Sequence, residues 1–118
     1  MTTPQALVDE AYDAFNARDL ARMRPLIHAQ AVWPNTLEDG PALVGREAVI
    51  GHFARIFATM LPNIQLIRVV DETTDTLTVE AQYSVESHDG HVWTDTRATL
   101  TYHFRDGLLS GMTIVGGF

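Results

Sequence analysis

Residues 76–87 read Thr-Leu-Thr-Val-Glu-Ala-Gln-Tyr-Ser-Val-Glu-Ser, and apolar side chains alternate with polar ones from Leu77 to Glu86. Successive side chains of a β-strand point to opposite faces of a sheet, so this pattern predicts a strand with one buried face. Such alternation is typical of antiparallel sheets, which cover one face and leave the other in water. The apolar face then needs a second layer of structure to bury it.

The segments on both sides of this strand extend the sheet. Asp89-Gly90 is a hairpin turn signal, and residues 91–104 return as the next strand. Asp106-Gly107 is a second turn, which leads into a strand over residues 108–115. Residues 64–71 form a further strand, but their irregular pattern leaves its register open. The second half of the chain is therefore predicted to be an antiparallel meander.

The first half of the chain is predicted to be helical. Thr3 is a suitable N-cap, with Pro4 at the first helical position. Asp19 is the predicted cap of a second, short helix that continues to Ile27, and Pro25 inside it should shorten or kink it. The first of these helices has an apolar face made of Leu7, Val8, Ala11, Tyr12 and Phe15.

A short strand at 31–33 and a loop at 34–45 should follow, and then a third helix from about Arg46 to Met60. This order predicts an α+β fold, a cone-shaped α+β barrel in which three N-terminal helices pack on a strongly curved antiparallel sheet. The length of 118 residues and the absence of any linker-like stretch predict a single domain over residues 1–118.

The composition disfavours several classes of partner. The formal net charge is −7, with eight arginines and no lysine against 15 acidic residues. A protein that binds nucleic acids or anionic membranes needs a basic surface patch, so neither nucleic acid nor membrane is expected as a partner. No apolar run approaches the roughly 18 residues of a membrane span. The N-terminal stretch lacks the pattern of a secretory signal, so a cytoplasmic location is expected.

Four segments carry a resemblance to a known family: Tyr12 to Asp19, Val32 to Asn35, Gly45 to Val49 and Phe104 to Leu109. They resemble the nuclear transport factor 2-like superfamily, and within it the SnoaL-like proteins, which include polyketide cyclases. Ketosteroid isomerase and limonene epoxide hydrolase are more distant members. The resemblance spans nearly the whole chain and implies the cone-shaped fold, but this fold hosts many unrelated functions.

The resemblance to ketosteroid isomerase can be followed residue by residue. That enzyme uses a carboxylate base and an oxyanion hole made of a Tyr and a protonated Asp. Its Tyr would fall on Tyr12, its base near Asn35 and its oxyanion Asp near Leu100. Two of the three groups are missing, so this isomerisation is not expected.

The relay of limonene epoxide hydrolase can be followed in the same way. Its aromatic-x-Asn matches Trp33-Pro34-Asn35, but tryptophan offers an N–H donor and no hydroxyl. The Arg and Asp of its relay would fall on Ala81 and Tyr83, and its last acid near Ile114. The charged relay is absent, so epoxide hydrolysis by this route is not expected either.

The resemblance implies an inner pocket that is apolar and aromatic, with neutral polar groups and no charged side chain, as is usual for small-molecule sites. Trp33 has an alternative role as a plug of the core, and Asn35 has one as a cap of the loop backbone. The implied lining is Tyr12, Phe15, Trp33, Asn35, Phe53, Phe57, Ala81, Tyr83, Val85, Leu100, Tyr102, Met112 and Ile114.

The histidines are the candidate titrating groups. His28, predicted at the end of the second helix, is the first choice as a proton carrier, although it could simply stabilise that helix end. His52 should sit on the pocket rim, and His103 should face away from the pocket. His88 and His91 flank a hairpin turn where side chains are usually solvated, so no metal site is predicted.

The leading hypothesis is a cofactor-free protein that binds an apolar small molecule, polyketide- or steroid-like, in the cone. Asn35, His28 and Tyr12 are the candidate catalytic residues, with isomerase-, cyclase- or hydrolase-like chemistry as the options. The alternative is a non-catalytic dimerisation or interaction module whose interior is filled. The outer sheet face, with Trp93 beside Asp95 and Arg97, predicts a homodimer contact, because family members often pair through this face.

Overall fold

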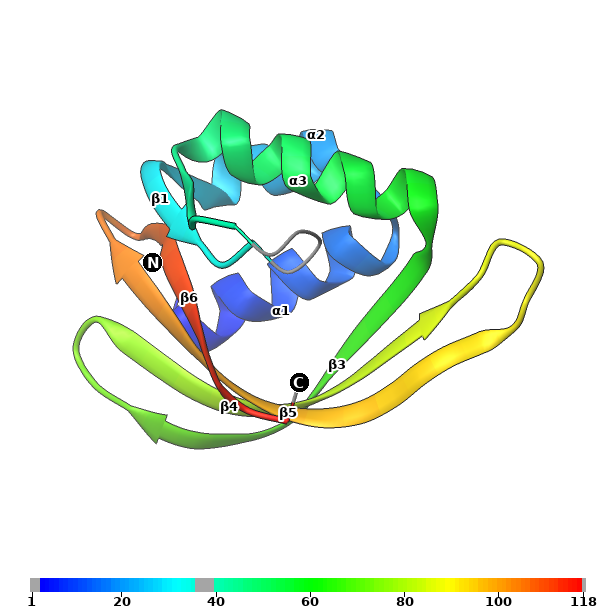
Figure 1. Ribbon diagram of the computed structural model, residues 1–118. Helices are drawn as coiled ribbons and strands as arrows, with labels where there is room; N and C mark the ends of the chain where they lie inside the picture. Colours follow the sequence, from blue (N-terminus) through cyan, green and yellow to red (C-terminus); the bar gives the residue numbers. More distant parts are fainter. Residues whose placement is uncertain (1–2, 36–39, 118) are drawn as a thin grey trace.

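The predicted alternating strand is β4 (Thr76–Glu86), and it lies inside a six-stranded sheet of the order β2-β1-β6-β5-β4-β3. The computed structural model describes residues 3–35 and 40–117 (Figure 1). All neighbouring strands are antiparallel except β1 and β6, which are parallel. The other strands are β1 (Ile27–Trp33), β2 (Leu43–Val44), β3 (Leu61–Glu72), β5 (Val92–Arg105) and β6 (Leu108–Gly116).

Three helices, α1 (Pro4–Asn16), α2 (Leu20–Met23) and α3 (Arg46–Thr59), cover the concave face of this sheet, which confirms the predicted α+β cone (Figure 1). The Thr3 hydroxyl accepts a hydrogen bond from the Ala6 N–H, and the Asp19 carboxylate accepts one from the Arg22 N–H. Both predicted N-caps are thereby confirmed.

The second helix is shorter than predicted. The sequence suggested helix as far as Ile27, but α2 ends at Met23 and a 3₁₀ turn (Arg24–Leu26) follows it. Pro25 lies in this turn, where its missing N–H rules out the α-helical hydrogen bond. Strand β1 consequently begins at Ile27, four residues before the predicted start, and includes His28. The placement of His28 at a helix end was therefore wrong.

The sheet is bent because its ladders are interrupted by register shifts. In the β3–β4 pair, shifts occur between Leu66 and Arg68 and between Val69 and Asp71. The β4–β5 and β5–β6 pairs carry further shifts. An extra residue in one strand bends that strand and increases its twist. These bulges explain why the pattern over residues 64–71 was irregular, and they give the sheet its concave inner face.

Asn16, the last residue of α1, ties the helical layer to this sheet. Its side-chain amide donates to the Ile64 carbonyl at 2.8 Å, and its oxygen accepts from the Ile64 N–H at 2.9 Å. The side chain thus satisfies both backbone polar groups of one β3 residue, as a neighbouring strand would do. This pair of hydrogen bonds holds the end of α1 against the start of β3.

We predict that Asn16→Ala lowers the free energy of unfolding by about 1–3 kcal/mol, because it leaves the part-buried N–H and C=O of Ile64 without partners. Asn63→Ala is the matched control, since Asn63 is an exposed residue on the same strand. The control should change the free energy by less than about 0.5 kcal/mol. Urea unfolding followed by circular dichroism measures both, and equal effects of the two substitutions would contradict the role of Asn16.

Candidate functional site

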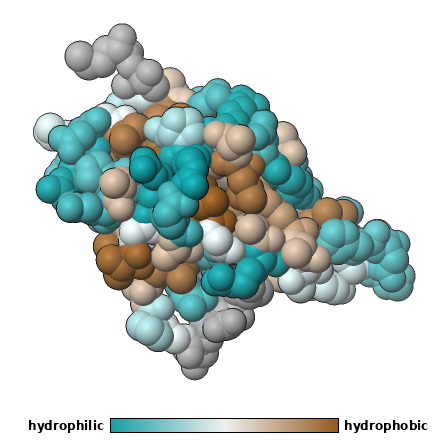
Figure 2. Space-filling view, turned by 90° about the horizontal axis from the view of Figure 1, so that it is seen from above, coloured by the Kyte–Doolittle hydropathy of each residue, from teal (hydrophilic) through white to brown (hydrophobic). Residues whose placement is uncertain are grey.

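A cavity of about 350 Å³ lies between the helices and the concave face of the sheet. Among the described residues, its lining contains no Asp, Glu, Lys or Arg. Seen from the helical side, apolar side chains lie between the helical body and a projecting hairpin with a hydrophilic tip (Figure 2). The lining consists of Ala11, Tyr12, Phe15, Met23, Ile27, Trp33, His52, Phe53, Ile56, Met60, Ile64, Tyr83, Val85, Trp93, Thr94, Leu100, Tyr102, Leu109, Met112 and Ile114.

Two tyrosines form the main polar feature of this cavity. The Tyr12 hydroxyl of α1 lies 2.7 Å from the Tyr102 hydroxyl of β5, and both side chains are buried. One hydroxyl donates to the other, so the second O–H proton finds no acceptor among the described residues. Burial raises the pKa of Tyr12, and it raises the pKa of Tyr102 well above its ordinary value. Both phenols are therefore neutral hydrogen-bond donors at neutral pH.

Aromatic rings surround this pair. The Trp33 ring lies 6.3 Å from the Tyr102 ring and 6.0 Å, edge to face, from the Phe53 ring. Phe53 in turn meets Phe15 edge to face at 5.8 Å. Such contacts hold the rings in defined positions and stabilise them beyond simple area burial. The cavity wall around the hydroxyl pair is thus preformed.

His52 is a buried polar side chain of α3 that lines the cavity with 1% of its surface exposed. The sequence placed it on the rim, but the structure places it in the wall. Helical spacing explains this position, because His52 lies three residues after Val49 and four before Ile56, both of them buried. The same spacing was the signal by which its burial could have been found.

Most of the residues expected around the pocket do line the cavity. These are Tyr12, Phe15, Trp33, Phe53, Tyr83, Val85, Leu100, Tyr102, Met112 and Ile114. Two others belong to the packing behind it: Phe57 lies 5.2 Å from the Phe15 ring, and Ala81 is fully buried in the core. Trp33 is both core and lining, since it is 7% exposed and borders the cavity.

Asn35 is not among the residues that line the cavity. It is half-buried just beyond the end of β1, and its amide nitrogen would lie 3.8 Å from a Cβ added at Gly40. This position fits the alternative role as a cap of the loop better than an orienting amide in the pocket. Residues 36–39, which belong to the predicted loop at 34–45, lie outside the described residues.

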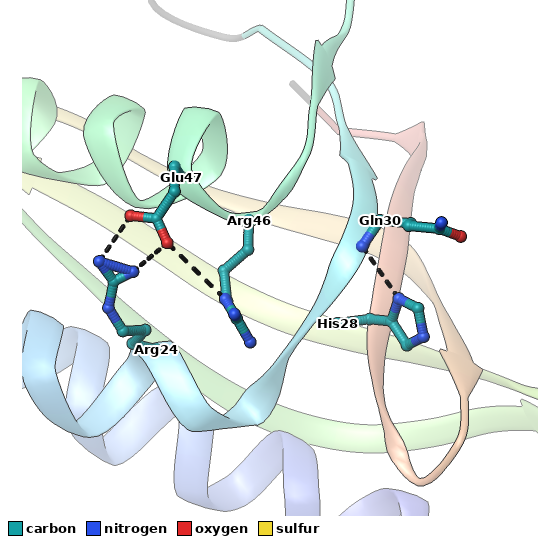
Figure 3. A network of polar contacts seen from close by, with 5 residues as sticks. All are labelled: Arg24, His28, Gln30, Arg46 and Glu47. Atoms are coloured by element: carbon teal, nitrogen blue, oxygen red, sulfur yellow. Dashed lines mark hydrogen bonds and ion pairs between the residues drawn. The ribbon is translucent and has the colours of Figure 1, made fainter.

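His28 also does not line the cavity. Its Nδ1 accepts from the Gln30 N–H at 3.0 Å (Figure 3). Its Nε2 lies 3.0 Å from the Asp106 carboxylate in the β5–β6 turn. Nearby on the surface, Glu47 bridges Arg24 and Arg46 (Figure 3). These are structural contacts. The position of His28 on β1 rules out its alternative role at a helix end, and its role as a proton carrier stays a prediction that the described cavity lining does not support.

Trp93 lines the cavity although the sequence placed it on the outer sheet face. Strict alternation from Tyr102 back along β5 would put Trp93 outside, beside Asp95. The β4–β5 ladder, however, pairs Val85 with Thr94 and Glu86 with Val92, so Trp93 is an extra residue at a bulge. A bulge redirects a side chain. The expected placement of Trp93 on the outer face was therefore wrong, while the homodimer and the part of Trp93 in it stay predictions.

The sequence missed several apolar residues of the lining. Met23 and Ile27 flank the 3₁₀ turn, and Ile64 lies on the strand of which the register was open. Ile56 and Met60 lie four residues apart in the predicted third helix and therefore share one face, which was a sufficient signal for both. The sequence carries no indication of the bulge at Trp93. A residue that breaks the alternation of polar and apolar side chains can be either an extra residue in the strand or an apolar residue on the outer face.

Within residues 3–35 and 40–117, no group of three or more His, Asp or Glu side chains could hold a metal ion. The described helices include none that is long and apolar enough to cross a membrane.

A family model described as "SnoaL-like domain" matches residues 8–112. No curated protein matches the chain significantly in sequence. Three similar solved structures show the fold.

RV0760c from Mycobacterium tuberculosis, in complex with estradiol-17beta-hemisuccinate, has a TM-score of 0.85 and 17% identity, covering 98% of this chain and 95% of that one. Delta 5-3-ketosteroid isomerase from Mycobacterium sp. has a TM-score of 0.82 and 14% identity, covering 95% and 91%. A computationally designed 17-OHP binder has a TM-score of 0.85 and 16% identity, covering 98% and 94%.

We predict that the protein loses stability as the pH rises above about 10, the ordinary pKa of tyrosine. Burial raises the pKa of Tyr12, Tyr83 and Tyr102, so the unfolded chain releases these protons before the folded chain does. The free energy of unfolding is then retained below that pH and falls above it. Urea unfolding at a series of pH values measures this loss.

Tyr12→Phe should make the alkaline loss of stability less steep, because it removes one of the three groups. Phenolate absorbance should appear only together with unfolding. A folded protein that titrates three tyrosines near pH 10 would contradict the prediction.

Proposed function

The chain belongs to the SnoaL-like domain family, and from this premise we propose that it binds a small, largely apolar molecule that carries a hydrogen-bond-accepting oxygen. The observation that carries the proposal is the hydroxyl pair of Tyr12 and Tyr102 inside an apolar cavity. Its remaining O–H donor is buried, and a buried donor without an acceptor costs free energy. A carbonyl or hydroxyl oxygen of a ligand would supply that acceptor.

The size and polarity of the cavity support this proposal. A volume of about 350 Å³ is at the lower end of the roughly 300–1,000 Å³ range of small-molecule sites. The absence of charged side chains from the described lining favours a neutral ligand body, because nothing there would compensate a buried charge. An open space of this size also argues against the alternative of a filled interior.

Two of the structural neighbours support a steroid-like shape as the first ligand to try. One is solved in complex with estradiol-17beta-hemisuccinate, and another is described as a binder of 17-OHP. Steroids combine a rigid apolar body with oxygens at its ends, which matches the donor pair and the apolar wall of the cavity.

We predict that Tyr12→Phe weakens the binding of estradiol-17β-hemisuccinate by about tenfold, because a neutral hydrogen bond contributes about 1 kcal/mol or slightly more. The Tyr12→Phe/Tyr102→Phe double variant should weaken it further. Calorimetric titration measures the affinities, and thermal unfolding with and without the steroid gives an independent readout.

Asn35→Ala is the control that distinguishes a site in which the tyrosine hydroxyls orient the ligand from one in which Asn35 does. Asn35 does not border the cavity, so Asn35→Ala should change the affinity for the steroid by less than about twofold. A change of this size is usual for a polar residue that does not touch the ligand. Loss of binding in Asn35→Ala but not in Tyr12→Phe would restore Asn35 as the orienting residue and overturn the role of the tyrosines.

Proton transfer on the bound molecule is a second candidate function, and His52 is the observation that favours it. Imidazole exchanges protons near neutral pH, and His52 is in the cavity wall. It would take a proton from a carbon next to a ligand carbonyl and return it at another carbon. The tyrosine hydroxyls would stabilise the enolate oxygen formed between the two steps.

A Δ5-3-ketosteroid is the test substrate for this second function, with the absorbance of the conjugated product as the readout. His52→Gln should abolish any turnover but leave steroid affinity within about threefold, since a general base acts on the transition state. His103→Gln is the matched control, because the His103 side chain forms a hydrogen bond with Thr113 on the outer face of the sheet. Turnover that survives in His52→Gln would exclude His52 as the base.

A further inference from the structure

Trp93 is the extra residue of a bulge in β5. Val85 of β4 pairs with Thr94 and Glu86 pairs with Val92, so no β4 residue lies opposite Trp93. Val85 and Thr94 belong to the inner face and line the cavity, and Trp93 lines it with them. The bulge thus turns two consecutive β5 side chains toward the cavity where a regular strand would present one.

The indole is at the open end of this cavity. Trp93 is 57% exposed, whereas Trp33, the other tryptophan, is 7% exposed and is packed against Phe53 and Tyr102. The hairpin that carries Trp93 projects beyond the end of α3, and its tip is hydrophilic (Figures 1 and 2). The indole is therefore a large apolar ring that borders an apolar cavity and remains half in water.

The cavity connects Trp93 with the tyrosine pair along one strand. Tyr102 lies nine positions further along β5, and both residues line the same space. A β-strand rises about 3.3 Å per residue, so the strand path between them is roughly 30 Å before the bend of the sheet shortens it. A molecule that touches both ends must be elongated, while a short molecule held by the hydroxyls does not reach the indole.

We propose that Trp93 is the outer recognition residue of the cavity, where its indole stacks on a planar or flat apolar end of an elongated ligand. This inference rests on the proposed binding function, because the other end of the ligand is held by the Tyr12–Tyr102 hydroxyls. Stacking removes the exposed ring from water and adds a specific aromatic contact. The site then selects ligands by length as well as by the oxygen at the inner end.

Two probes of different length test this selection. Estradiol is a neutral, elongated steroid with a hydroxyl at one end and a flat aromatic ring at the other, and 2-naphthol carries one hydroxyl on a short ring system. Trp93→Ala should weaken the binding of estradiol by about fivefold to tenfold, the usual size of an aromatic stacking contact, and change the affinity for 2-naphthol by less than about twofold. Trp93→Phe should recover most of the steroid affinity, because it restores a ring at the same position.

Val92→Ala is the matched control. Val92 precedes Trp93 on the same hairpin and is 62% exposed, but it pairs with Glu86 and does not line the cavity. Its substitution should leave both affinities unchanged. As a second readout, Trp33→Phe leaves Trp93 as the only tryptophan, and the binding of estradiol should then shift the Trp93 fluorescence to shorter wavelength.

The possible outcomes separate the inference from the function on which it rests. If the native protein binds neither probe, the proposed function fails and the inference fails with it. If the native protein binds estradiol and Trp93→Ala binds it equally well, the inference alone is overturned. Sedimentation of the same variants completes the test: a loss of dimers in Trp93→Ala with unchanged affinity would assign the indole to a subunit contact instead.

Discussion

The bend of the sheet is the constraint on which the rest of the structure depends. Its inner face is apolar from Leu77 to Val85 and must be removed from water, yet the bulged ladders make this face too concave for three helices to fill. A flat sheet would pack directly against α1 and α3 and leave a solid core. Because the sheet curves, the helices close only part of the space, and the remainder is the cavity.

The cavity is kept open by rigid neighbours rather than by polar filling. Trp33, Phe53 and Tyr102 contact one another through ring edges and faces, and such packed rings do not collapse into an adjacent space without losing those contacts. The Asn16 side chain fixes the end of α1 to β3, which holds Tyr12 on the same helix in place. The position of the Tyr12–Tyr102 hydroxyl pair therefore depends on the same contacts that stabilise the fold.

The family resemblance and the geometry of the site lead to different residues. The two known mechanisms point to Asn35, and the choice among the titrating side chains was His28, but neither residue is part of the described cavity lining. Tyr12 is, and its hydroxyl partner is Tyr102, a residue the sequence identified as lining but not as the partner of Tyr12. The described cavity lining holds no charged side chain, so the proposed function rests on the neutral tyrosine donors and His52.

The sequence by itself determined the class of the fold and most of the inner face. The alternation over 76–87, the caps at Thr3 and Asp19 and the turns at Asp89-Gly90 and Asp106-Gly107 are local signals, and local signals can be read along the chain. Only the tertiary structure decided where strands gain an extra residue, where β1 begins after Pro25, and which hydroxyls meet. These features depend on pairing between segments far apart in sequence, and a shift of one residue in that pairing moves a side chain such as Trp93 from the outer face to the cavity.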